Sequence, residues 1–290
     1  MSTRSTISKK SAIATPESAA EGNAGRKRMT VPAFTARKGG EPLVCLTSYT
    51  AHVAALCDEQ CDLLLVGDSL GMVIHGMPNT LGVTLEHMIM HGQAVVRGAN
   101  KAIVVVDMPF GSFEESPEIA FRNASRVVKE TGCHAVKLEG GADMAPTIQY
   151  LARRGIPVMA HIGLMPQAMN TAGGFKAVRD EAQFDAVIAD AKSVEAAGAF
   201  SVVVEGVAAP LAKQITDAIR IPTIGIGASA ACDGQILVFE DMVGLLRRVP
   251  TFVKRYGTME EMMRSSIEQY AEEVRARRFP GEEHTYKTKG

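Results

Sequence analysis

Short runs of apolar residues alternate with amphipathic stretches from Val31 onward. Eight runs have the length of a strand and are apolar throughout, rather than at every second position. They cover residues 44–48, 63–66, 103–106, 135–138, 157–161, 201–204, 223–226 and 236–238. Continuous apolar runs of this length are typical of parallel strands that are buried on both faces. The pattern therefore predicts eight parallel strands.

Amphipathic stretches between these runs predict helices. Residues 120–129 carry apolar side chains at three- and four-residue spacing, which places them on one helix face. The preceding Ser116 and Pro117 predict an N-cap and a first helical residue. Residues 184–197 and 211–219 repeat the apolar spacing. The chain therefore reads as a series of β/α units.

Eight β/α units in roughly 260 residues predict an α/β fold, a single (β/α)8 TIM barrel over residues 29–290. The alternative is an open doubly wound sheet, since residues 225–230 match the loose dinucleotide pattern GxGxxA. That match follows the seventh run rather than the first. No acidic residue ends a strand about 20 residues later, as a ribose contact requires. We therefore expect a glycine-rich loop at the barrel mouth, where backbone approaches a ligand closely.

The first 28 residues differ in composition from the rest of the chain. Ser, Thr, Ala, Gly and charged residues dominate residues 1–28, which predicts a disordered tail. A mitochondrial targeting peptide is the alternative, because basic residues such as Arg4 and Lys9 lie among Ser and Thr. The acidic Glu17 and Glu21 count against it.

Composition excludes several classes of protein. With 31 basic and 32 acidic residues the net charge is −1, so we expect no nucleic-acid partner. No apolar run approaches the roughly 20 residues of a membrane span, so we expect no membrane association. Five scattered cysteines do not form a disulfide framework. Cys57 and Cys61 would share a helix face, but no further ligands complete a metal site. Free thiols in a reducing, cytoplasmic compartment are the prediction.

Polar side chains occur where the predicted strands end. They are Asp68 and Ser69 after the second run, Asp107 after the third, Lys137 and Glu139 in and after the fourth, His161 in the fifth, and Glu205 after the sixth. Each could be structural on its own, as a helix cap, a Lys137–Glu139 pair or a core histidine. In a barrel, however, the carboxyl ends of the strands meet at one mouth, so these residues predict an active site.

This set of side chains predicts metal-assisted chemistry on a small 2-oxo acid. Crowded carboxylates repel unless a cation joins them, and hard oxygen donors favour Mg²⁺, Mn²⁺ or Ca²⁺. The metal would polarise the keto oxygen and stabilise an enolate as the α-carbon loses a proton. Glu205, on the opposite arc of the barrel, is the candidate base. Lys137 and Ser69 would hold the substrate oxygens.

Eight stretches resemble the ketopantoate hydroxymethyltransferase family, in order from about residue 30 to the end. They are VGDSLGMVIHG (66–76), VVVDMPF (104–110), AVKLEGG (135–141), AHIGLMPQ (160–167), VVVEGV (202–207), IPTIGIGA (221–228), CDGQILV (232–238) and FPGEEHTY (279–286). The resemblance implies a barrel like that of phosphoenolpyruvate mutase and isocitrate lyase. It also implies transfer of a hydroxymethyl group from 5,10-methylenetetrahydrofolate to 3-methyl-2-oxobutanoate with Mg²⁺, giving 2-dehydropantoate for pantothenate synthesis.

The resemblance also implies roles for individual residues. The Mg²⁺ ligands would be Asp68, Asp107 and Glu139, and Glu205 would be the proton acceptor. The oxo-acid contacts would be Asp68, Ser69, Asp107, Lys137 and His161. Family members are cytoplasmic in bacteria and often homo-oligomeric, commonly decamers, so we expect a homo-oligomer.

Four places depart from the family pattern, all in predicted loops around the mouth: Met165, residues 173–182, Ser229 and Glu240. They bear on folate use and substrate more than on the enolisation step. We expect residues 170–182 to form a lid. The alternatives are another Mg²⁺-dependent, enolate-forming carbon–carbon lyase or transferase, and an inactive scaffold barrel.

Overall fold

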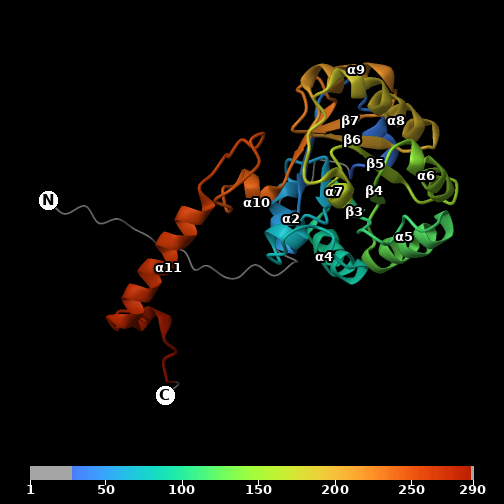
Figure 1. The fold of residues 1–290 in the computed structure, drawn as a ribbon. Helices are drawn as coiled ribbons and strands as arrows, with labels where there is room; N and C mark the ends of the chain where they lie inside the picture. The colour runs from blue at the N-terminus through green and yellow to red at the C-terminus, as the bar shows by residue number, and fades with distance from the viewer. Residues whose placement is uncertain (1–27, 289–290) are drawn as a thin grey trace.

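Eight parallel strands close into a barrel in chain order (Figure 1). The computed structural model describes residues 28–288, and the predicted tail lies outside this range except for Arg28. The strands are β1 (Leu43–Thr47), β2 (Leu63–Val66), β3 (Ile103–Asp107), β4 (Ala135–Glu139), β5 (Val158–Gly163), β6 (Ser201–Glu205), β7 (Thr223–Ile226) and β8 (Gly234–Leu237). The predicted (β/α)8 barrel is confirmed, and the open sheet is wrong.

Helices surround the barrel and connect its strands. The α-helices are α1 (Val31–Thr35), α2 (Ala51–Asp58), α3 (Leu70–Val73), α4 (Leu85–Gly98), α5 (Pro117–Thr131), α6 (Ala145–Ala152), α7 (Met169–Ala172), α8 (Phe184–Ala196), α9 (Ala209–Ala218), α10 (Phe239–Met242) and α11 (Met259–Arg275). The predicted start of α5 is confirmed, because the Ser116 side chain accepts a hydrogen bond from Ile119 N at 3.2 Å. The helix ends at Gly132, whose φ of 75° favours glycine.

Strand β8 begins two residues earlier than predicted. Gly234 lies so close to β1 that a Cβ there would be 2.6 Å from the carbonyl oxygen of Leu43. The next residue, Gln235, is polar and exposed, so the apolar run is interrupted there. The backbone of Gln235 nevertheless pairs with Val44. A close backbone approach therefore extends this strand through residues that the apolar pattern leaves out.

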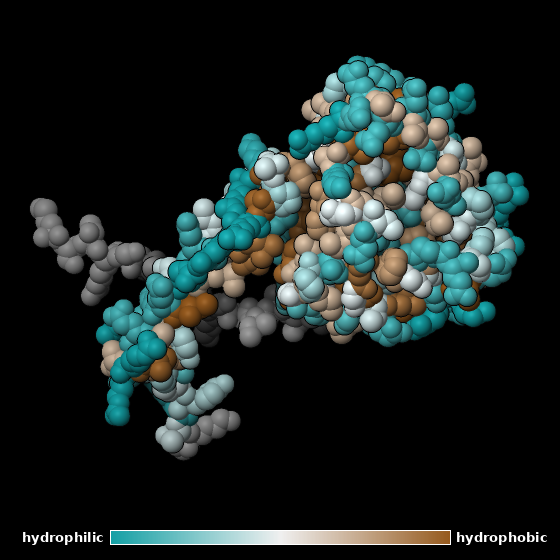
Figure 2. All heavy atoms as spheres, viewed as in Figure 1, coloured by the Kyte–Doolittle hydropathy of each residue, from teal (hydrophilic) through white to brown (hydrophobic). Residues whose placement is uncertain are grey.

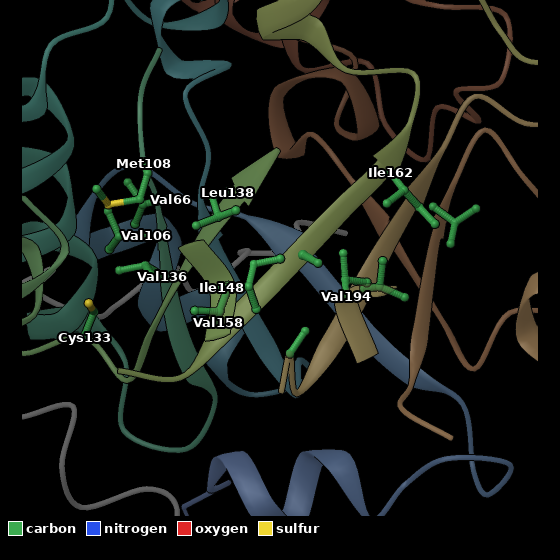
Figure 3. Packing of buried hydrophobic residues seen from close by; sticks show 14 of the residues in the cluster. Val66, Val106, Met108, Cys133, Val136, Leu138, Ile148, Val158, Ile162 and Val194 are labelled. Carbon is green, nitrogen blue, oxygen red and sulfur yellow. The ribbon is translucent and has the colours of Figure 1, made fainter. Parts of the chain in front are cut away.

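Two apolar layers hold the barrel together. One lies inside it and includes Leu63, Leu65 and Ile103, while the larger one lies between the strands and the helices. Figure 3 shows part of the outer layer, in which Val136 and Val158 of the barrel lie near Ile148 of α6. Alternate residues of each strand enter the two layers, which explains why the runs are apolar throughout.

Helix α1 closes the end of the barrel where the strands begin. Phe34 is fully buried within the inner layer and meets Phe200 edge to face, with ring centroids 5.9 Å apart. The backbone N–H of Met29 donates to the carbonyl of Lys101 and holds the start of this segment. Among the described residues, this end of the barrel is therefore filled by apolar side chains.

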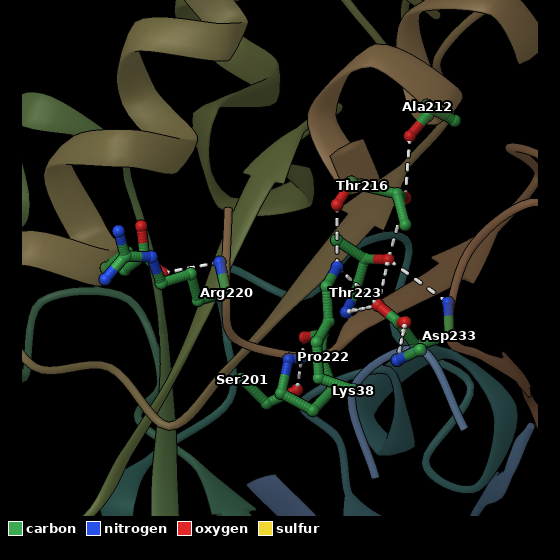
Figure 4. A network of polar contacts seen from close by, with 10 residues as sticks. Lys38, Ser201, Ala212, Thr216, Arg220, Pro222, Thr223 and Asp233 are labelled. Atoms are coloured by element: carbon green, nitrogen blue, oxygen red, sulfur yellow. Dashed lines mark hydrogen bonds and ion pairs between the residues drawn. The ribbon is translucent and has the colours of Figure 1, made fainter. Parts of the chain in front are cut away.

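A half-buried polar clamp joins the turn after α1 to the last two strands (Figure 4). The carboxylate of Asp233 accepts hydrogen bonds from Lys38 Nζ at 2.8 Å and from Thr223 N at 2.8 Å. It also accepts from Gly39 N at 2.8 Å. Burial would raise the pKa of Asp233, but these donors outweigh it and lower the pKa. The clamp therefore depends on an ionised Asp233.

Residues 238–288 add no strand to the barrel. Helix α11 projects away from it, contains no buried residue, and exposes Met262, Ile267 and Tyr270 (Figures 1 and 2). No helix among the described residues is both long and apolar enough to cross a membrane.

Replacing the central carboxylate of the clamp should destabilise the fold. We expect Asp233→Ala to lower the free energy of unfolding by about 3 kcal/mol at pH 7, because Lys38 loses its buried partner. The difference from wild type should shrink as the pH falls below the ordinary Asp pKa of about 3.9, since protonation removes the same ion pair. Urea unfolding at several pH values measures both effects.

The exposed pair Lys213–Asp217 provides the control. Asp217→Ala should cost about 0.5 kcal/mol or less. Equal losses in the two variants would contradict a structural role of the clamp.

Candidate active site

The inward-facing row of each strand changes from apolar to polar toward the carboxyl end. On β3, for example, Ile103 and Val105 lie in the inner layer and Asp107 follows with the same orientation. Strands β4, β5 and β6 repeat this change, and the resulting polar residues are Lys137, Glu139, His161 and Glu205. Because side chains alternate along a strand, the register that fills the barrel also brings these groups together.

Asp68, Asp107 and Lys137 form the deepest part of the site. The N–H of Asp68 donates to Asp107 Oδ2 at 3.0 Å, and Lys137 Nζ lies 2.8 Å from Asp107 Oδ1. Burial and the nearby Asp107 raise the pKa of Asp68 to about 7. Burial also raises the pKa of Asp107, although Lys137 opposes the shift. The pocket therefore holds more negative charge than its single lysine balances.

His161 lies between two carboxylates. Its Nδ1 is 3.4 Å from Glu139 Oε1 and its Nε2 is 3.3 Å from Glu205 Oε2. Burial and the positive charge of Lys137 lower the pKa of His161, but the two carboxylates outweigh them and raise it to about 9. One carboxylate oxygen lies near each ring nitrogen, and Lys137 Nζ lies 3.3 Å from Nδ1 as well, so these three groups position the ring between the carboxylates. Glu205 remains the more accessible of the two, with 17% of its side chain exposed.

Two further residues complete the site and were not predicted. The Gln167 side chain donates to Asp68 Oδ2 at 2.8 Å, and its backbone N–H donates to Glu139 Oε2 at 3.0 Å. Tyr49 OH lies 2.8 Å from Ser69 Oγ. Gln167 ends the motif AHIGLMPQ, but a neutral amide does not stand out in a search for charges. Tyr49 follows the first apolar run, and only the fold shows its proximity to Ser69.

A cavity of about 970 Å³ lies above these groups. Asp68, Ser69, Asp107, Lys137, Glu139, His161 and Glu205 all line it. Phe175 and Arg179, within the predicted lid, line it as well, and Val178 forms a β-bridge with Val207. Phe252 from the C-terminal segment lies over Gly227, where an added Cβ would be 2.7 Å from its ring. The structure therefore places every predicted site residue around one cavity.

Of the departures from the family pattern, only segment 173–182 lines this cavity; Met165, Ser229 and Glu240 do not. Segment 173–182 contributes lining residues. Glu240 is buried at the start of α10, and burial raises its pKa to about 7. Its neighbour Asp241 lines the cavity.

The donors of the site fit a divalent cation with oxygen ligands. Two buried carboxylates with raised pKa values are the donors that a nearby cation would keep ionised. Mg²⁺ usually takes one or two carboxylates and completes its octahedron with water and substrate oxygens. Within residues 28–288 no three His, Cys, Asp or Glu side chains are arranged to hold a metal by themselves. Asp68 and Asp107 are thus the natural pair, and direct ligation by Glu139 stays a prediction.

Residues 28–282 match the family described as ketopantoate hydroxymethyltransferase. The chain is 62% identical over 264 residues to a 3-methyl-2-oxobutanoate hydroxymethyltransferase of Parvibaculum lavamentivorans, covering 91% of this chain and 96% of that one. It is 58% identical over 264 residues to the enzyme of the same name from Rhizobium etli, covering 90% and 97%.

Solved structures of low sequence identity share the fold. One is 2,3-dimethylmalate lyase, described as a member of the PEP mutase/isocitrate lyase superfamily. It superposes with a TM-score of 0.53 at 16% identity, covering 82% of this chain and 98% of that one.

Removing the buried ammonium should destabilise the site in the absence of ligands. We expect Lys137→Met to lower the free energy of unfolding by about 3 to 5 kcal/mol, because the buried Asp107 loses its partner. Urea unfolding gives the value. The double variant Lys137→Met/Asp107→Asn should recover part of the loss. The exposed Lys213→Met is the control, and a similar small loss in both single variants would disprove the charge balance described above.

Proposed function

The chain belongs to the ketopantoate hydroxymethyltransferase family, and we propose that it is a 3-methyl-2-oxobutanoate hydroxymethyltransferase. It takes 3-methyl-2-oxobutanoate, 5,10-methylenetetrahydrofolate and water, and yields 2-dehydropantoate and tetrahydrofolate for pantothenate biosynthesis. One observation carries this proposal: an accessible carboxylate, Glu205, faces a cavity whose deepest part gathers Asp68, Asp107 and Lys137.

The buried end of the cavity binds the oxo acid. Lys137 Nζ and Ser69 Oγ line this end and donate to the negatively charged oxygens of the substrate. Tyr49 fixes the Ser69 hydroxyl through their 2.8 Å contact, and Asp107 fixes Lys137. Each donor is therefore held in place before the substrate arrives, which reduces the entropy lost on binding.

Glu205 removes the proton from C3 of the oxo acid. Its carboxylate lines the cavity from the end of β6, and Oε2 lies 3.3 Å from Nε2 of His161. Gln167 and Glu139 in turn hold the position of His161 and of the loop after β5. C3 then forms the new carbon–carbon bond to the one-carbon unit. Both carbon–nitrogen bonds of the folate methylene group break, water supplies the hydroxyl oxygen and its two protons go to the folate nitrogens, and the proton taken by Glu205 ends on the new hydroxyl group.

Asp68 and Asp107 would hold a Mg²⁺ ion, with Glu139 beside it as the family resemblance implies. When bound, the cation acts as a Lewis acid that draws electrons from the keto group and makes the C3 proton more acidic. Gln167 Nε2 donates to Asp68 Oδ2 at 2.8 Å, which keeps this carboxylate oriented toward the site.

The upper part of the cavity suits the second, larger substrate. A volume of about 970 Å³ exceeds what a five-carbon acid occupies. Phe175 and Phe252 offer aromatic surface, and Arg179 and Arg248 offer positive charge to an anionic folate. Segment 170–182 would act as the lid over this bound pair.

We also propose a cytoplasmic homo-oligomer, with the decamer of the family as the expected size. All five cysteines are free and buried, which suits a reducing compartment. The exposed Met262, Ile267 and Tyr270 of α11 support association with a second copy of the chain.

Replacing the base should abolish proton removal. We expect deuterium from solvent to enter C3 of 3-methyl-2-oxobutanoate when wild-type protein and Mg²⁺ are present. Glu205→Gln should slow this exchange by about 10²- to 10⁴-fold, because an amide cannot accept the proton. Proton NMR of the substrate measures the rate without any folate.

Glu118→Gln, at an exposed position in the first turn of α5, is the matched control and should exchange at the wild-type rate. Unimpaired exchange in Glu205→Gln would refute the assignment of the base. Adding 5,10-methylenetetrahydrofolate then tests the transfer. Exchange without formation of 2-dehydropantoate would favour the alternative of a related enolate-forming lyase.

Metal binding should depend on the two deepest carboxylates. We expect millimolar Mg²⁺ with the oxo acid to raise the melting temperature of the wild type, because ligands that bind only the folded state stabilise it. Asp68→Asn and Asp107→Asn should each remove the increase, while the exposed Asp143→Asn should retain it. An unchanged increase in Asp68→Asn would exclude this residue as a ligand.

A further inference from the structure

Three histidines lie together outside the cavity, where the loop after α3 meets α4. His75 follows α3, and His87 and His91 are one turn apart on α4. His75 Nε2 and His91 Nε2 are 3.1 Å apart, and the rings of His75 and His87 have centroids 5.1 Å apart. None of the three lines the cavity. The proposed reaction therefore leaves this cluster without a role.

Backbone contacts determine which nitrogen of His91 is free. His91 Nδ1 lies 2.8 Å from the carbonyl oxygen of Tyr49, and because a carbonyl can only accept, Nδ1 carries the proton. The Nε2 atom of the neutral ring then has a lone pair that faces His75. A histidine that donates one ring N–H to a backbone carbonyl is the usual arrangement of a metal-binding histidine.

The second histidine is also available as a ligand. Because His91 Nε2 accepts in this arrangement, the 3.1 Å contact makes His75 Nε2 the donor, and a bound metal ion would replace that proton. His75 is an exposed residue. His87 is differently placed, because its Nδ1 accepts a hydrogen bond from Thr84 N at 3.1 Å in the cap of α4.

We propose that His75 Nε2 and His91 Nε2 form a two-histidine site for a transition-metal ion such as Zn²⁺ or Cu²⁺, separate from the carboxylate site. Nitrogen ligands about 2.0 to 2.1 Å from the ion lie about 3.3 Å apart at a tetrahedral angle and about 2.9 Å apart at a right angle. The observed 3.1 Å lies between these values.

The chemistry of the two sites keeps their ions distinct. Imidazole nitrogens favour Zn²⁺, Cu²⁺ and Ni²⁺, whereas Mg²⁺ prefers carboxylate and water oxygens. No third His, Cys, Asp or Glu among the described residues completes a protein-only coordination shell. Water would fill the remaining positions, so we expect a weaker site than a closed structural zinc site. His87 stacks beside His75 and shields one side of it.

The test is a metal titration of the full-length chain without an affinity tag, in excess Mg²⁺. We expect calorimetry with Zn²⁺ to show one saturable site in wild type and in Asp68→Asn, whose carboxylate site is impaired. His75→Gln should weaken Zn²⁺ binding at least tenfold. His52→Gln, an exposed histidine of α2 outside the cluster, is the matched control and should bind as wild type does.

A spectrum identifies the ligands independently of affinity. Electron paramagnetic resonance of bound Cu²⁺ should show two nitrogen ligands in wild type and fewer in His75→Gln. Unchanged deuterium exchange in His75→Gln would show that this variant folds. The absence of a saturable site, or equal Zn²⁺ binding in His75→Gln and wild type, would overturn the proposal. The contact between His75 and His91 would then be a hydrogen bond only. Zn²⁺ binding that is lost in Asp68→Asn but kept in His75→Gln would overturn it too, because the ion would then lie on the carboxylates.

Discussion

Closure of the barrel gives each strand one row of side chains that must lie inside. Near α1 this row is apolar, and it packs around Phe34. Toward the other end the same row becomes Asp107, Lys137, His161 and Glu205. The two-residue period of a strand therefore specifies both the core and the site, and a shift of one residue in register would destroy both.

The position of the charges explains why the site is built for a ligand. Lys137 is the one ammonium among Asp68, Asp107 and Glu139 in the buried part of the cavity. Lys137 and His161 are the basic neighbours of these buried carboxylates, and they replace the lost hydration only in part, which destabilises the site when no ligand is bound. The proposed cation would offset part of this negative charge and thereby favour binding of the proposed anionic substrate. The protein maintains this arrangement with neutral donors, of which Gln167 is the central one.

Much of this arrangement could be predicted from the sequence, because continuous apolar runs identify parallel strands and their ends identify the mouth. The pairing of charges could not. Two residues apart on β4, Lys137 and Glu139 suggest an ion pair, yet the register places Lys137 opposite Asp107 on β3. Pairing across strands depends on barrel closure, which no local pattern contains. Gln167 and Tyr49 were missed for a similar reason, since their roles arise from neighbours distant in the sequence. The projection of helix α11 away from the barrel could not be predicted either, because no local sequence pattern indicates it.

Helix α1 affects the route by which substrates enter the cavity and products leave it. Because Phe34 and Phe200 fill one end of the barrel, everything that reaches the buried carboxylates passes through the other end. Two reactants that share one entrance cannot bind in any order if one lies beneath the other. If the oxo acid binds beneath the folate, as proposed above, it must arrive first and its product must leave last. In this fold, an aromatic contact at the closed end of the barrel would thus set the order in which substrates bind and products leave at the open end.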